Sequence, residues 1–257
     1  MQEGAAADIR ACLRFYSRLP IEPGRDGHSM PDFGRVVWAT PLAGAIIGAF
    51  GSASILAAHI VHLGPFLSAA CAVSVLALAT GALHEDGLAD VADGFGGGAT
   101  RDQKLAIMRD SRLGAYGALA LCLATLLRVS AIAAIIDRGA FLAAFAIISA
   151  AALSRVAGLS PLLTLLPARV DGAGSSAATP SPSAMRHASY IASAIGLTPL
   201  LAGASLTQTV VSQMAAFGAA LVVGKIADRQ IGGYTGDVLG AAQQLAEIAV
   251  LMSLAAS

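Results

Sequence analysis

Two long stretches without charge set the strongest limit on how this chain folds. Residues 36–84 contain no Asp, Glu, Lys or Arg, and the same is true of residues 188–224. A helix that crosses a membrane needs about 20 mainly apolar residues, so each stretch is long enough for two such helices. We therefore expect two pairs of membrane-spanning helices, with turns near Gly64 and near Thr207.

Three further apolar segments, each interrupted by single charges, extend this pattern at residues 113–136, 140–159 and 238–254. Hydrophobic residues make up 56% of the chain and charged residues 12%, and the mean hydropathy is +0.72, which is not typical of soluble domains. We predict an all-α, polytopic membrane protein with about seven spans, within a range of about six to eight. Residues 1–257 are expected to form a single integral membrane domain.

The N-terminal segment, residues 5–19, has a different pattern and no apolar stretch long enough for a signal peptide. Ile9, Leu13 and Tyr16 recur at helical spacing, and arginines lie between them. This pattern predicts an amphipathic helix on the cytoplasmic membrane surface. The alternative is a disordered tail.

The cysteine spacing and the net charge argue against three features. The three cysteines share no ligand-like spacing, which argues against a disulfide and against a zinc site. The formal net charge is zero, which argues against nucleic-acid binding.

The distribution of basic residues predicts the orientation of the chain in the membrane. Lysines and arginines are concentrated at residues 10–35, 101–112, 155–186 and 225–229. With seven spans and a cytoplasmic N-terminus, all four segments fall on the cytoplasmic side, as the positive-inside rule requires, and Arg138 falls on the other side. Most acids follow the same partition, so we expect the chemistry at the cytoplasmic face.

An acidic block supplies the main candidate site. Asp86, Asp90 and Asp93 fall at i, i+4 and i+7, which on a helix places three carboxylates on one face. Like charges at this spacing repel one another, and carboxylates with substrate phosphates are typical Mg²⁺ ligands. We predict that these three residues bind Mg²⁺ within a cytoplasmic catalytic loop at residues 84–113. The alternative is a solvated acidic loop.

Glycines follow this block directly. Gly96, Gly97 and Gly98 are expected to end the helix and to offer backbone N–H groups to a phosphate or another part of the substrate. The segment is not a P-loop, because no Lys-Ser or Lys-Thr follows the glycines. A simple hinge is the alternative.

Two other segments carry candidate residues. At the entry to the third span, Asp110 is a further candidate metal ligand, and Arg109 and Arg112 are candidates for binding a diphosphate. The arginines also fit an ordinary positive-inside flank. Asp237 opens the last apolar segment, where it is a candidate catalytic acid or base, or a residue that complements the helix dipole.

Two charged residues lie inside predicted spans. They are Arg128 and Glu247, and a charged residue within a membrane is a candidate functional residue. The two could form an ion pair.

The motifs resemble those of the cobalamin synthase family, adenosylcobinamide-GDP ribazoletransferase. Residues 84–94 read HEDGLADVADG, where the family has a histidine and then a DGLADxxDG stretch. Residues 107–117 read IMRDSRLGAYG, close to the family's IMRDSRIGTFG, and residues 233–241 read GYTGDVLGA. Departures are mild: Tyr116 replaces a usual Phe, and Glu85 stands where an apolar residue is common.

This resemblance implies an Mg²⁺-dependent transferase in the bacterial inner membrane. Such enzymes join adenosylcobinamide-GDP to α-ribazole, or to its 5′-phosphate, and release GMP, which completes the nucleotide loop of cobalamin. The resemblance thus implies small-molecule substrates. We expect membrane lipid around the protein, and its many small residues allow close helix packing and homo-oligomers alike. The hydroxyl proton would pass to Asp93 or Asp237, because a base must reach the attacking oxygen.

Two rival functions share some of these features. A CDP-alcohol phosphatidyltransferase also carries an aspartate motif at a helix end, but it has an Ala-Arg soon after its Asp-Gly, where this chain has Phe95-Gly96. A membrane transporter also embeds acids in helices, but its substrate acids lie near the membrane midplane.

Overall fold

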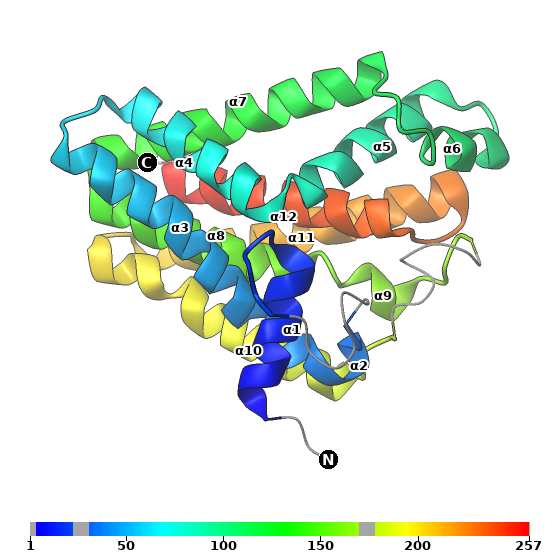
Figure 1. Ribbon diagram of the computed structural model, residues 1–257, viewed down its shortest axis with the longest axis horizontal. Coiled ribbons are helices and arrows are strands. Elements are labelled where there is room, and N and C mark those ends of the chain that lie inside the picture. Colours follow the sequence, from blue (N-terminus) through cyan, green and yellow to red (C-terminus); the bar gives the residue numbers. More distant parts are fainter. Residues whose placement is uncertain (1–3, 23–30, 170–177, 257) are drawn as a thin grey trace.

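The computed structural model describes residues 4–22, 31–169 and 178–256, and it is a bundle of helices (Figure 1). In this part of the chain the only β-type pairing is an isolated bridge between Pro167 and Tyr234. The helices are α1 (Ala5–Tyr16), α2 (Phe33–Val36), η1 (Val37–Ala39), α3 (Thr40–Ile60), α4 (Pro65–Thr80), α5 (Leu83–Gly97), α6 (Arg101–Ile107), α7 (Ala115–Arg138), α8 (Ala140–Ala157), α9 (Pro161–Thr164), α10 (Pro182–Gly196), η2 (Thr198–Ala202), α11 (Leu206–Ile231) and α12 (Gly236–Ala255).

Membrane-spanning helices are confirmed, but they are fewer than the seven expected. Among the described residues, five helical segments are long and apolar enough to cross a membrane, and α4 with α5 gives a sixth if that bent pair is one span. The five segments are Phe33–Ile60, Ala115–Arg138, Ala140–Thr164, Leu206–Ile231 and Gly236–Ala255.

The difference comes from residues 188–224, which were expected to hold two spans. Of the helices there only α11 is long enough, because α10 has 15 residues and begins at Pro182, in a polar segment. The turn before α11 also differs from the prediction near Thr207. It lies at η2 and Gly203, just before the cap residue Ser205. The expected turn at Gly64 is confirmed, since Gly64 is the N-terminal cap of α4.

Helix α8 lies in the middle of the bundle and contacts α3, α7, α10 and α12. Its junction with α3 depends on small residues. A Cβ atom added to Gly44 would collide with the carbonyl oxygen of Ala151, and one added to Gly48 would lie 3.0 Å from the Ala151 side chain. Such close backbone approach through glycine is typical of helix pairs in membranes.

Hydrogen bonds identify the two ends of the bundle. At one end, Arg138 donates to the carbonyl oxygen of Leu254 (2.6 Å) and to the side chain of Gln208 (3.2 Å). At the other end, Arg101 donates to the carbonyl oxygen of Ile231 (2.9 Å). Arg138 is therefore at the end opposite to the basic segment at residues 101–112, as the charge pattern predicted.

The N-terminal segment forms the helix α1, which has one buried face. Cys12, Leu13 and Tyr16 are buried, whereas Arg10 is exposed. The buried face contacts α2, η1 and α3, so it packs on protein. Its position on a cytoplasmic membrane surface stays a prediction. Of the N-terminal basic segment, residues 23–30 lie outside the described residues.

A sharp bend sets the direction of α5. Gly81 and Ala82 both have left-handed backbone conformations, with φ of +65° and +56°. They turn the chain by 90° between α4 and α5. The positive φ at Ala82 is unusual for a residue with a Cβ atom, which indicates that the surrounding packing enforces this bend.

Candidate active site

The site is built where α5 crosses α12. A Cβ atom added to Gly87 would lie 2.9 Å from the carbonyl oxygen of Asp237 and 3.3 Å from the Cα atom of Gly240. Two helices can approach this closely only where no side chain separates their backbones. The crossing thus brings the acidic block of α5 next to Gly236 and Asp237, the first two residues of α12.

Asp86, Asp90 and Asp237 lie close together at this crossing, and Asp93 is near them. Asp90 interacts repulsively with Asp237, Asp86 and Asp93, and attractively with Arg169. Asp86 is exposed, and Asp90 and Asp237 are partly buried. Repulsion among nearby carboxylates favours a bound cation. The predicted grouping of Asp86 and Asp90 is therefore accompanied by Asp237, which comes from the far end of the sequence.

Arg169 is a site residue that the sequence argument did not single out. Its Nη2 lies 3.3 Å from Oδ2 of Asp237, which also accepts a hydrogen bond from Thr235 at 3.2 Å. The segment before Arg169 is held by the β-bridge, in which the N–H of Ala168 donates to the carbonyl of Tyr234 (2.8 Å). A Cβ atom on Gly233 would collide with the neighbouring backbone, so this glycine permits the bridge.

The third aspartate of the motif has a different environment. Asp93 is 8% exposed, and its Oδ2 and Oδ1 accept hydrogen bonds from the backbone N–H groups of Gly114 (2.7 Å) and Gly117 (2.8 Å). These are donors that the first turn of α7 leaves unpaired. Asp93 therefore caps α7 from another helix, and its roles as metal ligand and base stay predictions.

The helix ends within the glycine run, as expected, although its last two residues are themselves glycines of that run. Gly96 and Gly97 lie within α5, where backbone N–H groups bond to carbonyls four residues earlier. The N–H of Gly98, the C-terminal cap, donates to the carbonyl of Gly94 (3.1 Å). A Cβ atom on Gly96 would lie 2.7 Å from the ring of Tyr116. Close packing explains this glycine, and phosphate binding by Gly96, Gly97 and Gly98 stays a prediction.

An open pocket of about 480 Å³ joins the acidic block to the segment before α7. Both predicted arginines line it with Asp110, and Asp86 and Asp90 line it from α5. These five residues were expected in one site, and the fold brings them to one pocket. A pocket with carboxylates on one wall and arginines on another suits a phosphate substrate that is bound through a cation.

Asp110 and Arg112 form an exposed ion pair. Nη2 of Arg112 lies 2.5 Å from Oδ2 of Asp110, and the backbone N–H of Arg112 donates to Oδ1 of Asp110 (3.1 Å). The Arg112 side-chain hydrogen bonds lower the pKa of Asp110 to about 2. The Asp110 carboxylate is thus paired with Arg112, and metal binding by Asp110 stays a prediction.

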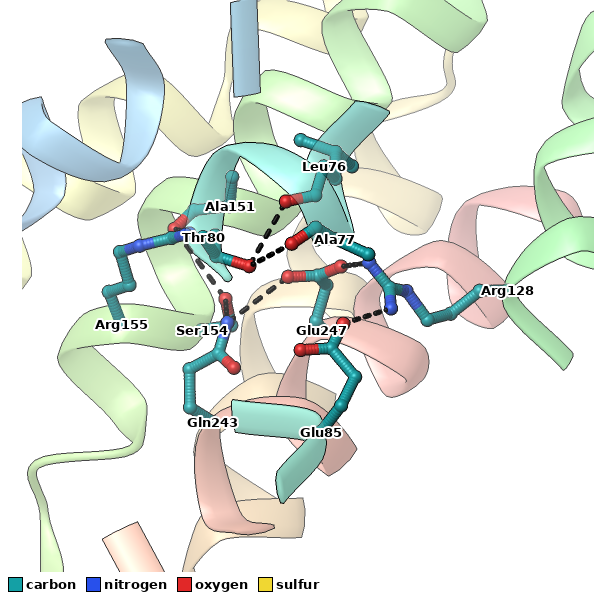
Figure 2. A network of polar contacts seen from close by, with 10 residues as sticks. All are labelled: Leu76, Ala77, Thr80, Glu85, Arg128, Ala151, Ser154, Arg155, Gln243 and Glu247. Atoms are coloured by element: carbon teal, nitrogen blue, oxygen red, sulfur yellow. Dashed lines mark hydrogen bonds and ion pairs between the residues drawn. The ribbon is translucent and has the colours of Figure 1, made fainter. Parts of the chain in front are cut away.

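Arg128 is the centre of a buried polar network (Figure 2). Its guanidinium contacts Glu85 (2.7 Å) and Glu247 (2.9 Å), and Gln243 donates to Glu247 (3.1 Å). The expected pair of Arg128 with Glu247 is confirmed. Glu85, which departs from the family pattern, is the second partner, and it explains how an arginine with 3% exposure is stabilised.

The carboxylates at the crossing are suitable in kind and number as protein ligands for Mg²⁺. Within residues 4–22, 31–169 and 178–256, no three Asp, Glu, His or Cys side chains are arranged to hold a metal by themselves. Mg²⁺ is usually bound by one or two protein carboxylates together with water and substrate phosphates. Asp86 and Asp90 provide such carboxylates on the wall of an open pocket.

Comparison with known proteins gives consistent matches over nearly the whole chain. The family model described as Cobalamin-5-phosphate synthase matches residues 8–255. Relatives named adenosylcobinamide-GDP ribazoletransferase, from Azorhizobium caulinodans and Xanthobacter autotrophicus, are 44% and 46% identical. The alignments cover 96% and 97% of this chain, and 95% and 96% of those relatives. A relative of the same name from Rhizobium etli is 43% identical over 97% of this chain and 96% of its own length. No solved structure gives a significant match.

Proposed function

The chain belongs to the cobalamin-5-phosphate synthase family, and we propose that it performs its transfer at the crossing of α5 and α12, with Mg²⁺ as cofactor. It is a transferase of cobalamin nucleotide-loop assembly. The donor is adenosylcobinamide-GDP, and the acceptor is α-ribazole or its 5′-phosphate.

One observation carries the location of the site. The open pocket combines Asp86 and Asp90 with Arg109 and Arg112, and Asp237 lies at the same helix crossing. A diphosphate is the part of the donor that needs both a cation and arginines, because it carries negative charge in the ground state and gains more on the leaving group. We therefore place the diphosphate in this pocket.

The transfer is a substitution at phosphorus. The 3′-hydroxyl oxygen of the acceptor bonds to the phosphorus nearer the cobinamide, and the bond from that phosphorus to the bridging oxygen breaks. GMP leaves with the bridging oxygen, and no atom is oxidised or reduced. The hydroxyl proton passes to a carboxylate, for which Asp237 is a better candidate than Asp93, because Asp93 is occupied by the α7 backbone.

Each group of this chain then has a defined task. Asp86 and Asp90 hold the cation, and Arg109 and Arg112 bind the phosphate oxygens. Arg169 orients Asp237 through their 3.3 Å contact. Bound Mg²⁺ would supply neutralisation of the charge that develops on the diphosphate.

The membrane position follows from the charge pattern. The five or six apolar helices among the described residues make this a membrane protein. We place it in the inner membrane, with the pocket facing the cytoplasm. Arg109 and Arg112 line the pocket and belong to the basic segment at residues 101–112, and the positive-inside rule assigns such segments to the cytoplasmic side.

The test is turnover by the purified protein. With adenosylcobinamide-GDP, α-ribazole and Mg²⁺, we expect equal amounts of GMP and adenosylcobalamin. With α-ribazole omitted, no GMP should appear. Release of GMP without an acceptor would indicate a hydrolase, and absence of GMP with both substrates would contradict the proposed function.

A further inference from the structure

A second, more enclosed cavity of about 170 Å³ lies next to the open pocket and shares only Asp86 with it. Residues of α1, α2, α5, α8 and α12 form it, together with two residues that follow α8, and Asp237 is among the lining residues. Most of its wall is aromatic or aliphatic. These wall residues are Phe15, Tyr16, Phe33, Leu83, Leu159 and Leu239.

Two buried polar side chains on this wall each have one atom without a hydrogen-bond partner. Arg155 is 3% exposed, and its Nη1 donates to the carbonyl of Ala151 (2.8 Å), but its Nε has no partner. Its guanidinium lies 5.7 Å from the ring centre of Tyr16. Unlike Arg128, it forms no ion pair with any residue in the described part of the chain.

Gln243 is the second such residue. It is 2% exposed, and its Nε2 donates to Ser154 (2.9 Å) and to Glu247 (3.1 Å). Because the Glu247 carboxylate can only accept, the amide orientation is fixed and Oε1 remains unpaired. Figure 2 shows the amide oxygen pointing away from both partners. Buried polar groups are nearly always paired, so one unused donor and one unused acceptor beside a single cavity point to a ligand.

We propose that this cavity binds the aromatic base of the acceptor nucleoside, which is a deepening that rests on the proposed function. An apolar cavity of about 150 Å³ takes up benzene, so this cavity of about 170 Å³, which is not fully enclosed, has room for a flat aromatic group but not for a whole nucleotide. A benzimidazole ring is flat and apolar and has one unprotonated ring nitrogen. That nitrogen can accept from Nε of Arg155, and a ribose hydroxyl can donate to Oε1 of Gln243.

The position of the carboxylates supports the same occupant. Asp86 lines both the cavity and the open pocket, and Asp237 lines the cavity. An acceptor whose base lies in the cavity would therefore have its ribose beside Asp237 and close to the diphosphate. The guanine of the donor fits this cavity less well. Arg109 and Arg112, which are proposed to bind the phosphates of the donor, line the open pocket and not this cavity.

Filling the cavity tests the proposal. Leu83 is 40% exposed and lines the cavity, so a Leu83→Trp side chain can enter it from the surface without replacing a core residue. We expect the KM for α-ribazole to rise about tenfold or more, with the KM for adenosylcobinamide-GDP within about twofold of wild type. Leu78→Trp is the matched control, because Leu78 is 77% exposed on α4 and does not line the cavity.

A second variant and a second readout make the test independent of turnover. Arg155→Lys keeps the positive charge but removes the Nε donor. Calorimetric titration of the full chain in detergent with α-ribazole alone should show binding that is weakened about tenfold in both variants and unchanged in the control.

Three outcomes would overturn the proposal: no binding of α-ribazole by the wild type, unchanged binding in both variants, or a rise in the KM for the donor alone. Failure of the proposed function would be a different result, namely no GMP release from both substrates, and the titration would still decide what the cavity binds.

Discussion

The carboxylate of Asp93 accepts hydrogen bonds from the backbone N–H groups of Gly114 and Gly117, at 2.7 and 2.8 Å. This contact joins the acidic helix α5 to the first turn of α7. It also explains both glycines, because a Cβ atom at either position would collide with the carboxylate. The motif aspartates are therefore expected to divide into one that holds the site together and two that act in it.

Substitution of Asp93 should mainly affect stability. In Asp93→Asn, one of the two N–H groups would face an amide N–H₂, so a buried hydrogen bond is lost at a cost of about 1–3 kcal/mol. We expect a lower midpoint of thermal unfolding in detergent for Asp93→Asn and an unchanged midpoint for Asp90→Asn. An Asp93→Asn protein as stable as wild type but inactive would instead support a role in metal binding.

The α5–α12 crossing should tolerate no side chain at Gly87. In Gly87→Ala the added Cβ atom would lie 2.9 Å from the carbonyl oxygen of Asp237, so the helices must move apart. Displacement of catalytic groups by about 1 Å can lower activity about 100-fold, and we expect kcat to fall by this order. Gly218→Ala is the control, since it also lies in a helix but has open space around it. Equal activity of both variants would contradict the role of the crossing.

Loss of the Arg128 side chain should strongly lower the stability of the protein. Arg128→Met would leave Glu85 and Glu247 without a counter-charge, and removal of one partner from a buried pair costs about 3–5 kcal/mol. We expect a large drop in the thermal unfolding midpoint, with partial recovery when Glu85→Gln and Glu247→Gln are added. The exposed Arg10→Met serves as control. No recovery in the triple variant would show that Arg128 has a role other than charge pairing.

The Asp110–Arg112 pair should not contribute to the pH dependence near neutrality. The pKa of Asp110 is lowered to about 2, so its contribution is present above the ordinary carboxylate pKa and is lost only as the pH falls through about 2. Wild type and Asp110→Asn should therefore give activity profiles of the same shape from about pH 5 to about pH 9. A shifted profile in the variant would show that Asp110 titrates during turnover.

Much of the fold could be predicted from hydropathy. Residues 113–136, 140–159 and 238–254 were expected to be spans, and α7, α8 and α12 lie there. The bend at Gly81 and Ala82 could not be predicted in the same way, because two left-handed residues leave no trace in apolar patterning. The short α10 was missed because absence of charge does not distinguish a full span from a shorter helix.

The site was predicted in part for similar reasons. Asp86 and Asp90 could be found because helical spacing is local, and Arg128 with Glu247 because charges in a membrane need partners. Arg169 beside Asp237 could not be found, since it depends on the bridge between Pro167 and Tyr234. The capping role of Asp93 likewise depends on how α5 packs against α7.

The proposed action of Mg²⁺ on the diphosphate of the donor depends on Asp86 and Asp90, with Asp237 as the base. Its most direct test is GMP release from adenosylcobinamide-GDP and α-ribazole by Asp90→Asn, compared with wild type, with Mg²⁺ and after chelation by EDTA. We expect wild-type release to stop with EDTA and to return with Mg²⁺, and Asp90→Asn to be slower by about 100-fold or more at equal thermal stability. Undiminished release by Asp90→Asn, or by wild type in EDTA, would contradict the account.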